Sequence, residues 1–278
     1  MSALRRAAVL VAIVAAGSGC AGGAPLLHPA RTLETGDFRA AGGVSANVVV
    51  GSLADDLRTA REIAGRDPQG TSTPGAPGTN PDYAKGALVA ANVAPGLAPF
   101  VGARVGVGSR FEGGLAYTGR AVRADMRRSF DADNWSLSLG LGASAALYGR
   151  QAGTDLPNVD LGALHGYGVD LPVLGGWQAS GGLYMFWFGA RAGFERDVVE
   201  SVTSEPKNVT IGPAPIRLDA TRWYGGPVLG AATGFHHVHV AIELGATYHT
   251  VTGSYNDTRV NVSGLSLTPA TALWWTFD

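Results

Sequence analysis

The chain has 278 residues and a formal net charge of −1, with 46% hydrophobic but only 15% charged residues. Soluble domains typically carry about 25% charged residues, so this composition is unusual for a fully hydrated surface. The near-zero net charge gives no electrostatic basis for binding nucleic acid. Beyond the N-terminus no run of about 18 apolar residues occurs, which excludes helical membrane spans.

The first 19 residues have the pattern of a secretory signal peptide. Arg5 and Arg6 precede an apolar run from Ala7 to Ala16, and small residues follow at 17–19. A charged start, a short apolar core and small residues at the cleavage site are the features that export signals share. We therefore expect residues 1–19 to be removed.

Cys20, the only cysteine of the chain, follows this segment directly. A single cysteine excludes a disulfide within the chain. Its position after small residues resembles the lipobox of bacterial lipoproteins, in which the cysteine is lipidated and becomes the mature N-terminus. We predict lipidation of Cys20, and the alternative is ordinary cleavage near Ala21 or Ala24. Residues 20–36 are expected to be a tether ahead of one folded domain at residues 37–278.

The first β-strand is predicted over residues 37–51, where small and apolar residues alternate with Arg39 and Asn47. Residues 52–82 break the alternation with a helix-like stretch and then a run rich in Pro, Gly and Thr, which has little capacity to bury a core. We expect a long loop outside the wall formed by the strands, continued by a helical turn through residues 83–93.

Three closely connected strands are predicted next, at residues 98–107, 110–118 and 120–130. One face of each strand is apolar and the other face carries charged residues. An Arg that faces lipid at the middle of a bilayer costs about 2–4 kcal/mol, so charges on one face of a long strand favour a polar interior on that side.

The clearest strand lies between Asn134 and Gly149. Every odd position from Trp135 to Leu147 is apolar, whereas the even positions are mainly Ser and Gly. A tilted strand needs roughly 9–11 residues to cross a bilayer, with apolar side chains toward lipid and small or polar ones toward a lumen. Strands of soluble sandwiches are usually about 5–6 residues long. This stretch therefore predicts a membrane-spanning strand.

Further strands are predicted at 161–175, 180–197, 221–235, 237–253 and 262–277, with polar loops at 149–160 and 198–220. Alternation is clear in most of them but poor in 161–175. Trp274, Trp275 and Phe277 near the C-terminus suit an aromatic girdle at a membrane interface.

The predicted fold is all-β, a transmembrane antiparallel up-and-down β-barrel of about ten strands, with 12 or 8 as alternatives. Bacterial single-chain barrels have even strand numbers, with long loops on one rim and short turns on the other. The predicted long loops fall at one end of such a barrel when both termini lie at the opposite end.

An exported chain of alternating strands that ends in an aromatic-rich strand resembles the bacterial outer-membrane β-barrel superfamily. The resemblance covers residues 37–277, and residues 98–130 also resemble predicted barrel lipoproteins of Gram-negative bacteria. In that superfamily the last residue is often Phe, which helps recognition by the assembly machinery; here Phe277 precedes Asp278. The resemblance implies a bacterial outer-membrane location with a periplasmic N-terminus. The implied partners are the lipid bilayer and the barrel assembly machinery.

Charged residues on the predicted inner faces form the main candidate feature. They are Arg104, Arg110, Glu112, Arg123, Asp125, Arg127, Arg191, Glu195 and Glu243. Because side chains fill the interiors of small barrels, we predict an ion-pair network in the lumen rather than a catalytic site.

Three histidines, His236, His237 and His239, lie near a predicted turn. His237 and His239 share a strand face, a spacing that can present two imidazoles to one metal. A third ligand at Glu243 would lie about 13 Å from His239 at about 3.3 Å per residue, which is too far. We therefore expect partly solvated histidines, no metal site and no cofactor.

His249, Ser254 and Asp257 offer the residue types of a hydrolase near the outer rim, but such triads are recognised by geometry and not by local sequence. We therefore expect a non-enzymatic protein with a structural or narrow-channel role. The alternative is a binding protein or hydrolase that uses the long rim loops at 52–82 and 198–220 and acts on envelope lipid or peptide.

Overall fold

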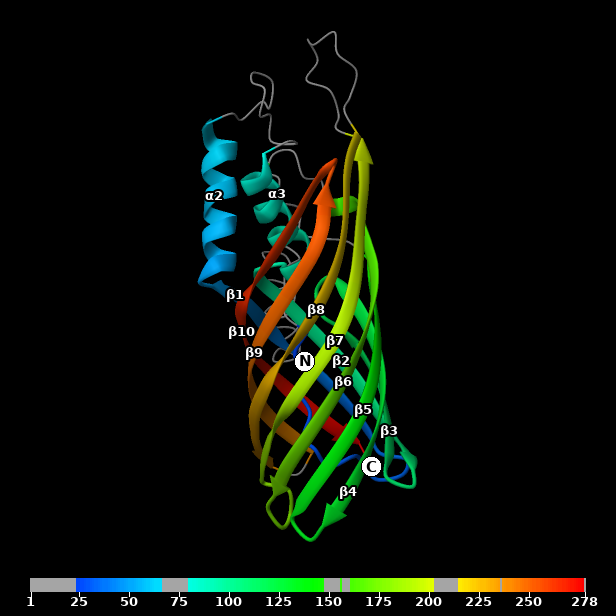
Figure 1. Cartoon of the computed structure of the whole chain (residues 1–278). Coiled ribbons are helices and arrows are strands. Elements are labelled where there is room, and N and C mark those ends of the chain that lie inside the picture. Colours follow the sequence, from blue (N-terminus) through cyan, green and yellow to red (C-terminus); the bar gives the residue numbers. More distant parts are fainter. Residues whose placement is uncertain are drawn as a thin grey trace, which may run out of the picture.

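The computed structural model describes residues 24–66, 80–147, 156, 161–202, 215–235 and 237–277. Its strands form a closed antiparallel barrel in which each strand pairs with its sequence neighbours and β1 pairs with β10 (Figure 1). The predicted up-and-down barrel of ten strands is confirmed. The predicted signal peptide and Cys20 lie outside the described residues.

The strands are β1 (Phe38–Val50), β2 (Gly96–Gly108), β3 (Phe111–Tyr117), β4 (Ala121–Ala132), β5 (Trp135–Ala146), β6 (Leu164–Gln178), β7 (Tyr184–Val202), β8 (Pro215–Phe235), β9 (Val238–Tyr255) and β10 (Thr258–Phe277). The loop predicted at 198–220 is wrong at both of its ends, because Val198 pairs with Asp219 and Val202 with Pro215. Main-chain pairing needs no alternation of side chains, so the hairpin continues where the sequence turns polar.

Three helical elements lie in the connection after β1, and a short one precedes β6: α2 (Ser52–Arg66), α3 (Pro81–Leu88), the π-helix η1 (Val89–Val93) and the 3-10 helix η2 (Leu161–Ala163). The end of the barrel that carries α2 and α3 is called the helix end here. The opposite end, where β1 begins and β10 finishes, is called the turn end (Figure 1). Among the described residues, no helix is long and apolar enough to cross a membrane.

The outer surface of the barrel is apolar along most strands. Leu139 and Leu141 of β5 are 49% and 59% exposed, and Phe188 of β7 is 52% exposed. The neighbouring Ser138 is only 2% exposed because it points into the barrel. The period of two in the sequence thus separates an apolar outer face from a polar inner face.

Trp274 corrects the girdle prediction. It is fully buried, and its ring centroid lies 5.8 Å from that of the buried Trp187 inside the barrel. Trp275 and Phe277 face outward and are 50% and 48% exposed. Adjacent residues on a strand point to opposite faces, so the two tryptophans could not both face outward.

The α3 helix closes the helix end of the lumen instead of lying in a loop outside the wall. Asn80 caps it, since its Oδ1 accepts a hydrogen bond of 2.9 Å from the Asp82 amide. Tyr83 and Leu88 are fully buried in one apolar cluster with inward-facing wall residues such as Val251. α2 packs against α3 at a glycine, Gly86, where a Cβ would lie 2.2 Å from the Cβ of an alanine of α2.

Residues 24–33, called the lumen segment here, enter the barrel at the turn end. Pro25 to Ala30 are all buried. Leu26, Leu27 and Ala30 belong to a second apolar cluster inside the barrel, which also contains Trp187 and Trp274. The sequence suggested a tether over residues 20–36. The structure instead places the described part of that stretch up to residue 33 within the lumen.

Candidate functional site: the barrel lumen

Glu243 holds the lumen segment from β9. Its carboxylate oxygens accept hydrogen bonds from the Leu26 amide at 2.7 Å and the Leu27 amide at 2.8 Å. The indole Nε1 of Trp187 donates a third bond, at 3.0 Å. No guanidinium pairs with Glu243 among the described residues. This buried carboxylate is therefore held by N–H donors, two of which belong to the backbone of the lumen segment.

Arg127 and Glu112 hold the other half of the lumen segment. The Arg127 guanidinium donates to the carbonyl oxygens of Pro29, Ala30 and Arg31, at 3.4 Å to Ala30 and 3.2 Å to Arg31. Arg127 also donates two bonds to Glu112, at 3.0 and 2.9 Å. Glu112 in turn accepts from the Leu33 amide at 2.8 Å.

From Glu112 a continuous chain of ion pairs crosses the inner wall. Arg104 pairs with both Glu112 and Asp125, and Asp125 also pairs with Arg123. Arg123 donates two bonds of 2.8 Å to Asp170 of β6. Asp170 accepts a further bond of 2.9 Å from Arg191 of β7, and Arg191 also donates to the carbonyl oxygen of Ala24. The network therefore ends on the lumen segment again.

A second cluster lies nearer the helix end. Arg120, in the turn before β4, donates to Glu195 at 2.8 Å and to Asp197 at 3.3 Å. It also donates to the carbonyl oxygens of Ala91 and Asn92 in η1. Glu195 additionally pairs with Arg222 of β8. Arginines of the wall thus bind the backbone of both the lumen segment and the helical closure.

Eight of the nine residues predicted for the network face the lumen and have the contacts described above. Arg110 does not join them, because it lies in the β2–β3 turn with a positive φ of 61° and pairs with Asp131 at the turn end. Arg120, Asp170, Asp197 and Arg222 belong to the lumen network but were not predicted. Asp170 occupies an inward position between exposed Val169 and Leu171, and this local alternation was the available signal.

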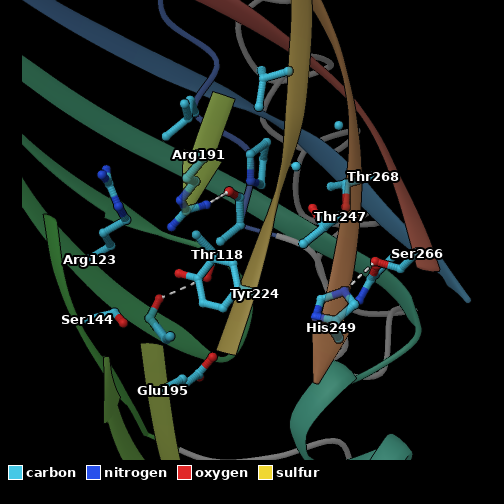
Figure 2. Close-up of a pocket in the computed structure, with 18 of the residues that line it drawn as sticks. Thr118, Arg123, Ser144, Arg191, Glu195, Tyr224, Thr247, His249, Ser266 and Thr268 are labelled. Atoms are coloured by element: carbon cyan, nitrogen blue, oxygen red, sulfur yellow. Dashed lines mark hydrogen bonds between the residues drawn. The ribbon is translucent and has the colours of Figure 1, made fainter. Parts of the chain in front are cut away.

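A polar cavity lies between the lumen segment and the helix end (Figure 2). Figure 2 shows Arg123, Arg191, Glu195 and Tyr224 on one side. Thr247, His249, Ser266 and Thr268 line the other side. The cavity therefore has one wall that is rich in charge, from β4, β7 and β8, and one wall from β9 and β10 that carries hydroxyl groups and the Glu243 carboxylate, which accepts from the Leu26 and Leu27 amides.

The hydrolase set considered from the sequence is not assembled. His249 faces the cavity and is 4% exposed, whereas Ser254 is an even-numbered residue of β9 and lies on the opposite face of the strand. The partner of His249 is Ser266, with 2.8 Å between the His249 Nε2 and the Ser266 Oγ. The His249 Nδ1 has no hydrogen-bond partner in the described structure. A histidine base held by a carboxylate is therefore not observed.

The histidines near the β8–β9 turn do not form a metal site in the described residues, where no group of three or more His, Cys, Asp or Glu residues could hold a metal ion. The imidazole Nε2 of His239 lies 2.9 Å from the carbonyl oxygen of Gly182, so this side chain forms a hydrogen bond with the β6–β7 connection at the turn end. His236 lies outside the described residues.

Solved structures similar to this chain include neisserial surface protein A, the outer-membrane protease OmpT from Escherichia coli and a major outer-membrane protein from Thermus thermophilus. Their sequence identities to this chain are 10%, 10% and 15%, and their TM-scores are 0.32, 0.38 and 0.31. The matches cover 87%, 88% and 86% of this chain and 99% of each of the three. No family model and no curated protein matches the sequence. The fold assignment rests on the strand pairing of this chain itself.

Proposed function

We propose that this chain is a bacterial outer-membrane β-barrel protein that acts as a narrow, non-enzymatic channel, and that the lumen segment closes it in the state described here. The observation that carries the proposal is the lumen segment itself. It lies inside a closed barrel, has no part in the sheet from residue 24 to 33, and is bound by side chains of the wall. It can therefore leave without breaking any strand pairing.

The outer face supports a place in a bilayer. Water-soluble monomers rarely expose contiguous apolar patches larger than a few hundred Å². Here every strand from β2 to β10 has large apolar residues that face outward and are exposed, among them Val101, Leu115 and Leu244 at 57%, 55% and 49%. Lipid is the solvent that makes such a surface favourable.

The short connections support a periplasmic turn end. In bacterial barrels short turns face the periplasm and longer loops face outside. At the turn end, where β1 starts, the β2–β3, β4–β5 and β8–β9 connections have two residues each. The helix end also has such a turn, between β9 and β10, but it has the long connections at 51–95 and 147–163 as well. This orientation puts the entry of the lumen segment at the periplasmic side and α3 at the outer mouth.

Lipidation of Cys20 has a geometric consequence within this proposal. The carbonyl oxygen of Ala24 is bound by Arg191, which lies seven residues, or about 23 Å along β7, from the turn-end residue Tyr184. The four residues from Cys20 to Ala24 span at most about 14 Å. An acyl group on Cys20 therefore reaches the periplasmic leaflet only when the lumen segment has left its position, so an acylated chain would be the open form and the closed form described here needs Cys20 without acyl groups.

Planar-bilayer conductance tests the channel. A full-length Cys20→Ser chain, which carries no acyl group, is compared with the same chain lacking residues 24–33, and heat-modified gel migration verifies that both are folded. We expect little or no conductance from the complete chain and discrete openings from the deletion variant. A folded deletion variant that stays silent would contradict the channel and favour a structural role.

A hydrolase is the second candidate, because the hydrogen bond between His249 and Ser266 resembles part of a catalytic pair. The pair lies on the cavity between the lumen segment and α3, where a phospholipid or folded protein has no access. Ester and peptide substrates are tested with the wild-type chain and with Ser266→Ala. We expect no hydrolysis that depends on Ser266. Turnover that depends on Ser266 would replace the channel proposal by an enzymatic one.

A further inference from the structure

Arg191 and Arg222 both lie close to the same aromatic ring in the cavity. The guanidinium carbon of Arg191 lies 5.6 Å from the ring centroid of Tyr224, and that of Arg222 lies 4.8 Å from it. Two cations on one ring repel each other, and the ring offsets this repulsion only in part. An anion placed between the guanidinium groups would reduce it further.

The carboxylates of the wall leave donors of both arginines unused. Glu195 is shared by Arg120 and Arg222, and Asp170 is shared by Arg123 and Arg191. The Nε atoms of Arg191 and Arg222 are buried and have no hydrogen-bond partner in the described structure. Buried N–H groups of a guanidinium are seldom left unpaired, because each lost charged hydrogen bond is costly.

The opposite wall supplies further neutral groups. Thr247 and Thr268 line the cavity with hydroxyl groups, which rotate to donate or accept. Asn47, at 4% exposure, has an Oδ1 without a partner in the described residues, and so has the Nδ1 of His249. The Glu243 carboxylate also lines this wall, so the wall suits the neutral or protonated end of a small polar molecule whose anionic end lies at the arginines.

The size of the cavity limits what it can hold. It offers about 80 Å³ to the centres of water-sized molecules, and one water needs about 10–15 Å³ by this measure. There is room for several waters or for one molecule as small as phosphate or a short carboxylic acid. Larger ligands such as oligosaccharides or peptides do not fit beside the lumen segment.

We propose that this cavity is a binding site for a small oxyanion, held between the guanidinium groups of Arg191 and Arg222 beside Tyr224. A carboxylate, and any pair of oxygens of a tetrahedral phosphate, can accept two parallel N–H bonds from a guanidinium group. The site does not depend on conduction, because it is assembled while the lumen segment is in place and Ala24 lines it. A silent barrel would still bind the anion, so the two proposals fail separately.

Isothermal titration of the folded, full-length chain in zwitterionic detergent tests the site, with inorganic phosphate, acetate and glycerol as separate probes at constant ionic strength. We expect saturable one-to-one binding of phosphate or acetate. The probe that binds more tightly shows whether the site takes a phosphate or a carboxylate. Arg222→Gln should weaken binding at least about tenfold, the loss expected for a charged hydrogen bond. Binding of glycerol alone, or no saturable binding because only water occupies the cavity, would overturn the proposal.

Arg217→Gln is the matched control. Arg217 lies on the same strand as Arg222, but it is exposed near the helix end and pairs with Glu200 at 3.6 Å. Its replacement should leave anion binding unchanged, and an equal loss in both variants would overturn the assignment. If Arg222→Gln does not fold, Thr247→Val keeps the ion pairs intact and removes a hydroxyl from the opposite wall. Anion binding unaffected by Thr247→Val would then count against the site.

Discussion

Replacing Glu243 by Ala should release the lumen segment while leaving the strand pairing of the barrel intact. The substitution removes the acceptor of the Leu26 and Leu27 amides, which donate at 2.7 and 2.8 Å. A hydrogen bond to a charged group contributes about 1.5–3 kcal/mol, so the two together contribute about 3–6 kcal/mol if they add. The backbone of residue 243 pairs with Gly230 and Ala270, and these pairings do not involve its side chain.

Hydrogen exchange followed by mass spectrometry measures this release directly. A loss of about 3–6 kcal/mol in the free energy of local opening should speed exchange of the Leu26 and Leu27 amides by roughly 10²- to 10⁴-fold, until the intrinsic rate is reached. Strand amides should keep their protection. The exchange rate of these amides in Glu243→Gln should lie between those of the wild type and Glu243→Ala. The Gln side chain keeps one oxygen as an acceptor, but its NH₂ group faces the other amide donor.

Glu200→Ala is the control for this experiment. Glu200 lies on β7 near the helix end, with an exposed side chain that pairs with Arg217 at 3.6 Å. Exposed ion pairs contribute little, so exchange should not change. If the lumen segment exchanges at the wild-type rate in Glu243→Ala, the two hydrogen bonds to Glu243 are not what holds it in the lumen. If all strands lose protection together, the segment is part of one cooperative unit with the wall.

Three further predictions concern the wall and the N-terminus. Leu139→Arg, on the outer face, should cost about 2–4 kcal/mol in the bilayer and reduce the heat-modified folded band, whereas Leu139→Met should not. Gly142→Val should disturb the Arg123 ion pairs, because even a Cβ at Gly142 would lie 2.4 Å from the Arg123 Nη2. Gly113→Val, where a Cβ meets nothing within 4 Å, should leave the melting temperature unchanged, and equal shifts would contradict the role of Gly142. Intact-mass measurement should find acyl groups on Cys20 in the mature protein, and a mass without them, with cleavage after Cys20, would refute lipidation.

The wall of the barrel could be predicted because a strand with one apolar face and one polar face must alternate. Leu139 and Ser138 show the period on β5, and the outer face allows few exceptions. The pattern was weaker on β6, where small inward residues such as Gly168 stand in for polar ones, so Asp170 was missed. Arg120 was missed for a different reason. The predicted strand 120–130 gives this even-numbered residue an outward position, whereas it lies in the turn before β4 and reaches into the lumen.

The contents of the lumen could not be predicted by the same reasoning. The lumen segment has no secondary structure, and its bonds run from backbone atoms to distant wall residues such as Glu243. A hydrogen bond from a backbone atom does not depend on the residue type, so the sequence gives no sign of it. Leu26 and Leu27 were a usable signal, because adjacent large apolar residues between an export signal and the first strand need a place away from water. The position of α3 depends likewise on the size of the mouth it fills.

The lumen segment also constrains the order in which the barrel is made. It leads directly into β1, and β1 pairs with β10 along the seam that completes the cylinder, from Phe38 with Phe277 to Val50 with Leu265. The first piece of the chain must therefore lie inside the curved sheet before the last strand docks, or be threaded in afterwards through the turn end. Burial of Leu26 and Leu27 against the inner wall stabilises the finished barrel by either route, and the two routes differ in whether the seam can close before the segment is in place.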